Sequence, residues 1–123
     1  MTRNDTGKLG ENAVCEYLEK SGYSVILRNY RIRGGEIDII ASDNEYIVFV
    51  EVKTRKPDSL VSCFDAVNSR KINLIIKTAS DYLTKNPCSL QPRFDVAGVT
   101  ALDGQILDID YIKNAFDLTG YNF

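Results

Sequence analysis

The sequence contains no histidine and no tryptophan, and it has only three cysteines and three prolines in 123 residues. Without histidine, Ser-His-Asp triads, Cys-His pairs and histidine-rich metal sites are excluded. Cys15, Cys63 and Cys88 are odd in number, far apart and without the spacing of a zinc site. This pattern favours reduced thiols in a cytoplasm over disulfides. The chemistry that is left uses carboxylates, lysines, hydroxyls and thiols.

Long apolar runs are also absent. No stretch is long enough to span a bilayer, and the first residues lack the apolar core of a signal peptide. We therefore expect a cytoplasmic protein without a membrane segment. A chain of 123 residues suits one domain with one hydrophobic core. We expect a single domain over 1–123, with its core at about 6–111 and a tail at 112–123.

The charge of the chain is nearly balanced, with a formal net charge of −2, and acidic residues prevail after Asp95. This balance argues against a protein that binds nucleic acid by charge alone. Basic residues nevertheless bracket the segment 37–53; they are Arg28, Arg31, Arg33, Lys53, Arg55 and Lys56. They form either a solvated surface or part of a binding surface.

The segment 37–53 organises the chain. Two apolar, β-branched runs flank the polar connector Ser42–Glu45, which predicts a β-hairpin. Because side chains alternate across a strand, Glu36 and Asp38 share one face of the first run.

The second run of this hairpin places Glu51 and Lys53 on one face. Antiparallel pairing brings Asp38 and Glu51 close together, with the lysine beside them at the open end of the hairpin. Charges in such an apolar setting are costly unless a cation or a substrate satisfies them. The alternative is a static, salt-bridged cluster.

The remaining elements follow from apolar periodicity and from glycine and proline positions, with Gly22 as the C′ residue of the first helix. The sequence predicts helices over 6–21 and about 65–84, and further strands over 23–29, 93–100 and 105–111. The order is helix, three strands, helix, two strands. It indicates an α/β protein with a mixed central sheet flanked by helices.

Three further positions carry alternative interpretations. Glu11 lies at the edge of the apolar stripe of the first helix, where it either reaches over the sheet or stays exposed. Lys71 borders the stripe of the second helix, in the first turn, where a cation opposes the helix dipole, and it is a candidate for phosphate contact. Arg93 either contacts phosphate or pairs with Asp95, two residues on along the predicted strand.

These motifs resemble the PD-(D/E)XK nuclease superfamily, since Asp38 is followed, after twelve residues, by Glu51-Val52-Lys53. Isoleucine, and not proline, stands before Asp38, which leaves the ligand in place. The chain is most similar to the small bacterial YraN-like family, whose members resemble archaeal Holliday-junction resolvases. The resemblance covers about 10–99, and the matching stretches are Gly10–Ala13, Tyr17-Leu18, Gly22, Asn29–Arg31, Gly35–Asp38, Phe49–Lys53, Arg55, Lys71 and Arg93–Asp95.

The resemblance implies a restriction-endonuclease-like core and a metal-dependent endonuclease that hydrolyses phosphodiester bonds in branched or structured DNA. Asp38, Glu51 and the backbone carbonyl of Val52 would hold Mg²⁺ or Mn²⁺, hard cations that prefer oxygen ligands. Lys53 would orient or deprotonate the attacking water, or neutralise the developing charge. Glu11 would be an extra ligand or would hold a metal-bound water, which completes a catalytic set of Asp38, Glu51, Lys53 and Glu11.

The resemblance also implies contacts to phosphates, from Arg31, Arg55, Lys71 and Arg93. Because two-fold junctions call for paired sites, a homodimer is expected, and the apolar tail near Phe116 and Phe123 is where we look for its surface. Two other classes of function remain. One is a nucleic-acid-binding module with little or no catalysis, and the other is a structural or protein-interaction domain.

Overall fold

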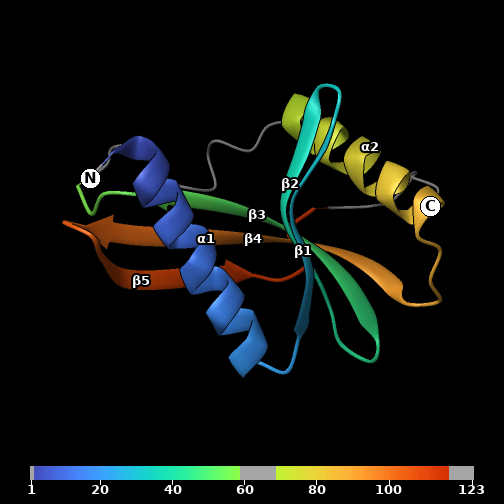
Figure 1. Cartoon of the computed structure of the whole chain (residues 1–123), viewed down its shortest axis with the longest axis horizontal. Coiled ribbons are helices and arrows are strands. Elements are labelled where there is room, and N and C mark those ends of the chain that lie inside the picture. Colours follow the sequence, from blue (N-terminus) through green and yellow to red (C-terminus); the bar gives the residue numbers. More distant parts are fainter. Residues whose placement is uncertain (1, 59–68, 117–123) are drawn as a thin grey trace.

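The chain was analysed as a computed structural model, which describes residues 2–58 and 69–116. Seven elements occur in the predicted order (Figure 1): α1 (Arg3–Lys20), β1 (Ser24–Ile32), β2 (Gly35–Ser42), β3 (Tyr46–Arg55), α2 (Ser69–Lys85), β4 (Gln91–Leu102) and β5 (Gln105–Ile112). None of the helices in these ranges is long and apolar enough to cross a bilayer.

The five strands form one mixed sheet, as the sequence predicts. The strand order is β1-β2-β3-β4-β5, so each strand lies beside its neighbours in sequence. Strands β3 and β4 are parallel because the chain returns through α2, whereas the other pairs are antiparallel. The central strand β3 therefore has β2 on one side and β4 on the other.

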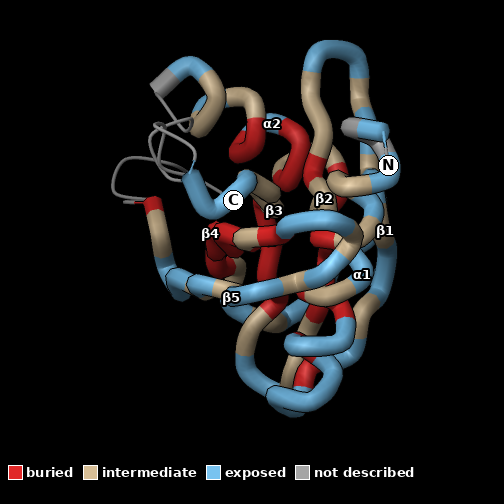
Figure 2. Tube along the Cα trace, turned by 90° about the vertical axis from the view of Figure 1, so that its left-hand side faces the viewer, coloured by how far each residue is buried: buried red, intermediate tan, exposed pale blue. Residues whose placement is uncertain are grey.

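The two helices pack against separate clusters of buried side chains on the sheet. Val14 and Leu18 of α1 pack with Val48 and Val50 of β3, among others. The intervening β3 residues, including Phe49, pack with the buried face of α2. Figure 2 shows how burial concentrates along β3, β4 and the inner side of α2. Since side chains alternate, the residues that follow Phe49 on the α2 side of β3 are polar, at positions 51 and 53.

Two glycines let the helices approach the sheet closely. A Cβ atom at Gly10 of α1 would lie 2.0 Å from Oγ1 of Thr54 on β3, and one at Gly35 of β2 would lie 2.1 Å from Oγ1 of Thr78 on α2. Such separations are far inside van der Waals contact. The absence of a side chain at these two positions therefore sets how near each helix lies to its strand.

The boundaries and some local details differ from the prediction. Helix α1 begins at Arg3 instead of Thr6, because Thr2 caps it in a reciprocal pair of hydrogen bonds with Asp5. Gly22 follows it with φ +95°, as a C′ glycine does. Strands β1 and β4 are longer than predicted. The predicted start of α2 before residue 69 lies outside the described residues.

The expectation about Phe116 as part of a dimer surface is wrong. Phe116 is buried against the α2 side of the sheet, with its ring centroid 6.2 Å from that of Phe94. The backbone N–H of Ala115 donates to the carbonyl of Phe94 at 2.7 Å and fixes this segment. Phe123 lies outside the described residues, as does Cys63. The two cysteines that the structure does describe, Cys15 and Cys88, are free thiols.

Candidate active site

Strands β2 and β3 separate at Asp38. Their ladder runs from Ser42 opposite Ile47 to Ile39 opposite Val50 and stops there. One residue past the ladder on β2 lies Asp38, and two residues past it on β3 lies Val52, whose backbone N–H donates to Oδ2 of Asp38 at 2.7 Å. A carboxylate thus replaces the carbonyl that an uninterrupted ladder would supply.

Beyond Asp38, β2 stays paired with β1 as far as Gly35, while β3 stays paired with β4 as far as Arg55. The β1–β2 hairpin therefore leaves β3 and rises toward α2 (Figure 1). The strict alternation expected for β2 fails at this bend, because Ile37 and Ile40 pack in the same cluster. A wedge-shaped cavity of about 290 Å³ opens between the two strands.

We call this cavity the wedge. It is lined by residues from the β1–β2 turn, β2, β3 and α2: Gly34, Gly35, Glu36, Asp38, Glu51, Val52, Lys53, Lys71, Leu74 and Ile75. The structure thus brings together three of the predicted catalytic residues, Asp38, Glu51 and Lys53. It adds Lys71, which the sequence placed near the site only as a phosphate contact.

Glu51 is the most enclosed charge of the wedge, with a side chain only 8% exposed. Its Oε1 atom lies 3.0 Å from Nζ of Lys53 and 3.1 Å from Nζ of Lys71. One carboxylate oxygen therefore receives two ammonium groups, one from its own strand and one from the opposing helix. Charge-assisted contacts of this kind are shorter and stronger than those between neutral groups, and they join α2 to β3 at this carboxylate.

Asp38 is not compensated in this way. Burial, together with the negative charge of Glu51, raises the pKa of Asp38 to about 7, against the hydrogen bond from Val52, which lowers it. The pKa of Lys71 is lowered by burial and by the neighbouring Lys53. The wedge therefore holds one carboxylate, that of Asp38, whose ionisation is disfavoured by burial and by the charge of Glu51.

The oxygen atoms in the wedge fit a hard divalent cation. In a strand the N–H and C=O of one residue point to the same side, so the Val52 carbonyl faces the wedge like its N–H. Asp38 and Glu51 add carboxylate oxygens. Within the described residues, no group of three or more acidic, histidine or cysteine side chains could hold a metal ion. Two carboxylates and a carbonyl suit Mg²⁺, which commonly keeps several waters.

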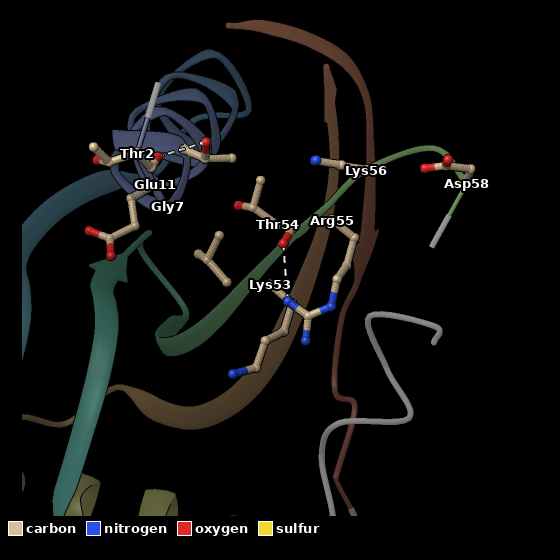
Figure 3. A pocket seen from close by; sticks show the side chains of 10 residues that line it. Thr2, Gly7, Glu11, Lys53, Thr54, Arg55, Lys56 and Asp58 are labelled. Carbon is tan, nitrogen blue, oxygen red and sulfur yellow. Dashed lines mark hydrogen bonds between the residues drawn. The ribbon is translucent and has the colours of Figure 1, made fainter. Parts of the chain in front are cut away.

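Glu11 lies outside the lining of the wedge, although its negative charge is close enough to help raise the pKa of Asp38. Its Oε1 atom accepts hydrogen bonds from Nη2 of Arg28 at 3.3 Å and from Nδ2 of Asn29 at 3.2 Å. It lines a second cavity instead of the wedge, on the side away from Arg55 (Figure 3). The structure does not bring Glu11 together with Asp38 and Glu51 as a third carboxylate.

The four predicted phosphate contacts occupy very different places. Arg31 is exposed and lies 3.4 Å from Glu36. Arg55 lines the second cavity and donates to the carbonyl of Thr54 at 3.1 Å. Lys71 lies in the wedge.

Arg93 is buried, and its guanidinium is held by protein groups. It donates to both carboxylate oxygens of Asp95, at 3.0 and 2.8 Å, and to the hydroxyl of Tyr23 at 2.8 Å. Asp95 is fully buried and also accepts from the Tyr111 hydroxyl and the Asn114 N–H. The ion pair, and not the phosphate contact, is the interpretation of Arg93 that the structure supports. Sequence reasoning missed both tyrosines, because no spacing signals their convergence.

Comparisons with known proteins give one family. The model of "Uncharacterised protein family UPF0102" matches residues 10–99. A UPF0102 protein of Syntrophus aciditrophicus is 48% identical over 120 residues, covering 96% of this chain and 94% of its own. A second, of Carboxydothermus hydrogenoformans, is 37% identical over 118 residues, covering 95% and 99%. UPF0102 protein CLJ_B2665 of Clostridium botulinum is 43% identical over 118 residues, covering 93% and 95%.

Proposed function

We propose that this chain, which belongs to the UPF0102 family of YraN-like proteins, is a metal-dependent endonuclease that acts on branched or structured DNA. The observation that carries the proposal is the wedge. There Asp38, Glu51 and the Val52 carbonyl face one another beside two lysines, at the point where β2 leaves β3.

The arrangement of elements supports the proposal. Helix α1, the β1–β2–β3 meander, helix α2 and strand β4 follow in the order expected of a PD-(D/E)XK core. Asp38 on β2 and Glu51 with Lys53 on β3 would then supply the two acidic residues and the lysine of that motif. We therefore assign the restriction-endonuclease-like fold as part of the same proposal.

Each group of the wedge has a role in phosphodiester hydrolysis. Asp38, Glu51 and the Val52 carbonyl would hold Mg²⁺ or Mn²⁺, which when bound supplies Lewis-acid stabilisation of the anionic transition state. Lys53 lies two residues beyond Glu51 on the same face of β3. It would orient the attacking water and neutralise the developing negative charge as an ammonium, because its pKa, which burial lowers, is raised on balance by its contact with Glu51 and by the charge of Asp38. Lys71, which enters from α2, contacts the phosphate from the opposite side of the wedge.

A second candidate function is a nucleic-acid-binding module that does not cleave. Two observations favour it: Glu51 is already neutralised by two ammonium groups, and Glu11 is held by Arg28 and Asn29 outside the wedge. Such a module would bind DNA in a salt-dependent way without turnover.

Cleavage assays separate the two functions. A labelled four-way junction, a flap and a blunt duplex are incubated with Mg²⁺ or Mn²⁺ and the wild-type protein, Asp38→Ala or Glu51→Gln. We expect cleavage by wild type and a loss of at least about 100-fold in either variant, as for removal of electrostatic stabilisation of a transition state.

The matched control is Glu45→Gln, which removes a carboxylate at the exposed, opposite end of the hairpin and should cleave like wild type. Cleavage that persists in Asp38→Ala or in excess chelator would overturn the proposal of a metal-dependent endonuclease. Binding without any turnover would favour the non-cleaving module.

A further inference from the structure

A second cavity, larger than the wedge, adjoins it. This cavity, here called the groove, has a volume of about 840 Å³ and lies between the N-terminal half of α1 and the end of β3 (Figure 3). Its lining residues are Thr2, Thr6, Gly7, Glu11, Val52, Lys53, Thr54, Arg55, Lys56 and Asp58. Val52 and Lys53 line both cavities, so the groove continues directly from the candidate catalytic groups.

The β3 wall of the groove is basic. Lys53 and Arg55 lie on β3 and Lys56 directly follows its last residue, and Figure 3 shows the side chains of Arg55 and Lys56 leaving this segment in different directions. Among the described lining residues Glu11 and Asp58 are acidic, but Glu11 is paired with Arg28 at 3.3 Å. Lys53 is likewise paired with Glu51 at 3.0 Å, so Arg55 and Lys56 against Asp58 set the charge of the groove. The balance of charge in the groove suits an anionic ligand.

In the same stretch β3 has no partner strand on the side that β2 has left, although β3 is the central strand of the sheet. The N–H of Val52 points to the side that β2 leaves and reaches Asp38. Because alternate residues of a strand point the same way, the N–H of Thr54 faces the groove, where the ladder with β2 has already ended at Ile39. A backbone donor between basic side chains suits a phosphate oxygen. The free edge is too short to add a peptide strand.

Gly7 contributes no side chain to the α1 wall of the groove. A Cβ atom at Gly7 would meet nothing within 4 Å, whereas one at Gly10, one turn on, would collide with Thr54. Packing therefore explains Gly10 and does not explain Gly7, although a glycine inside a helix lowers its stability. A side chain longer than alanine at Gly7 would project into the groove and narrow it.

We propose that the groove binds a single-stranded segment of nucleic acid that continues from the phosphate held in the wedge. The inference rests on the proposed function, and it names the substrate class as a duplex or junction with a single-stranded tail. A recess walled by a helix and a strand receives one flexible backbone, whereas a duplex is a convex body that proteins enter by its own grooves. None of the described residues that line the groove is aromatic, so the contacts that they offer are to the backbone and independent of base sequence.

The test is binding, measured by fluorescence anisotropy with Ca²⁺ in place of Mg²⁺ so that cleavage is not required. The probes are a blunt duplex and the same duplex with a ten-nucleotide 3′ or 5′ tail. We expect one of the tails to tighten binding to wild type by roughly tenfold, with a steeper dependence of affinity on salt.

Three variants test whether the groove is responsible for this gain in affinity. Arg55→Gln/Lys56→Gln should reduce the affinity for the tailed duplex to that for the blunt one. Gly7→Leu should do the same without a change of charge, because it fills the groove, while Gly7→Ala should bind the tail like wild type. Lys77→Gln/Lys113→Gln is the matched control, because it removes two exposed charges from outside the groove lining.

The outcomes separate this inference from the proposed function. Tail-dependent binding that is lost in Arg55→Gln/Lys56→Gln and in Gly7→Leu supports binding of a single strand in the groove, even if no substrate is ever cleaved. A tail that adds no affinity in wild type overturns it. So does an equal loss of affinity for blunt and tailed duplexes in both groove variants, whatever the cleavage assays show.

Discussion

Nζ of Lys71 lies 3.1 Å from Oε1 of Glu51, across the wedge and on the same oxygen that Lys53 contacts. The contact joins α2 to β3 near the start of the helix, and Tyr82, at the other end of α2, packs on Phe49 with ring centroids 6.1 Å apart. A cation that binds Glu51 must share this carboxylate with Lys71 or displace it.

Lys71→Gln should therefore affect metal binding and cleavage in opposite directions. Removing a competing ammonium should tighten Mn²⁺ binding by about three- to tenfold, equivalent to roughly 0.7–1.4 kcal/mol. Cleavage should fall by about tenfold or more, because the phosphate loses a cation. Calorimetry and a single-turnover cleavage assay measure the two effects.

Lys77→Gln, on the exposed side of the same helix, is the control for general charge loss and should change neither quantity. Weaker Mn²⁺ binding in Lys71→Gln would show that the lysine organises Glu51 for the metal instead of competing with it.

Asp38 should make the metal-free protein less stable as the pH rises. Its folded pKa of about 7 lies above the ordinary value of 3.8, so between these values the folded state binds more protons than the unfolded state. The free energy of unfolding then falls with increasing pH across this window. Asp38→Asn removes the ionisation, and it should raise the stability by roughly 1–3 kcal/mol at pH 8 and by almost nothing at pH 4.

Urea unfolding of both proteins in chelator at pH 4 and pH 8 gives these values. Saturating Mn²⁺ at pH 8 should stabilise the wild type and leave Asp38→Asn unchanged, since a ligand stabilises only the state that binds it. If Asp38→Asn were no more stable than wild type at pH 8, the ionised carboxylate of Asp38 would not destabilise the metal-free protein.

The sequence was sufficient to predict the order of the elements and the convergence of Asp38, Glu51 and Lys53. Period-two alternation placed Glu51 and Lys53 on one face, and the short connector Ser42–Glu45 set the pairing that brings Asp38, just past the end of the ladder, near them. These relationships are local, within one hairpin. Local patterns are what a single sequence encodes most directly.

Contacts between distant elements could not be predicted in the same way. Whether Lys71 reaches Glu51 depends on how closely α2 approaches the sheet, which Gly35 sets through its contact with Thr78. The position of Glu11 was inferred from a resemblance, and its pairing with Arg28 depends on the course of β1. Such distances come from tertiary packing and not from spacing along the chain.

Arg93 should be essential for stability and not for metal binding. Arg93→Ala leaves Asp95 as a fully buried anion without its main partner, a change that typically costs about 3–5 kcal/mol. Tyr111→Phe removes one hydrogen bond from the same carboxylate and should cost about 1–2 kcal/mol. Urea unfolding measures both losses.

The double variant Arg93→Met/Asp95→Leu separates a structural pair from a phosphate contact. Without either charge it should recover much of the stability, and its Mn²⁺ and DNA affinities should equal those of wild type. A stable double variant with tenfold weaker DNA binding would return Arg93 to the list of phosphate contacts.

Gly7 and Gly10 should respond oppositely to the same substitution. Gly7→Ala places a methyl group in open space and should stabilise the protein by about 0.5–1 kcal/mol through helix propensity. Gly10→Ala drives a methyl group to 2.0 Å from Oγ1 of Thr54 and should cost about 1–3 kcal/mol.

Thr54→Ala tests the cause of that loss. The threonine Oγ1 atom is buried without a hydrogen-bond partner among the described residues, so its removal alone should cost little. In this background Gly10→Ala meets only the Cβ atom, at 3.2 Å, and most of the penalty should disappear. An unchanged penalty in the double-mutant cycle would mean that this contact does not set the distance between α1 and the end of β3. That distance fixes the width of the groove, so the rescued double variant should also keep the tail-dependent binding of wild type.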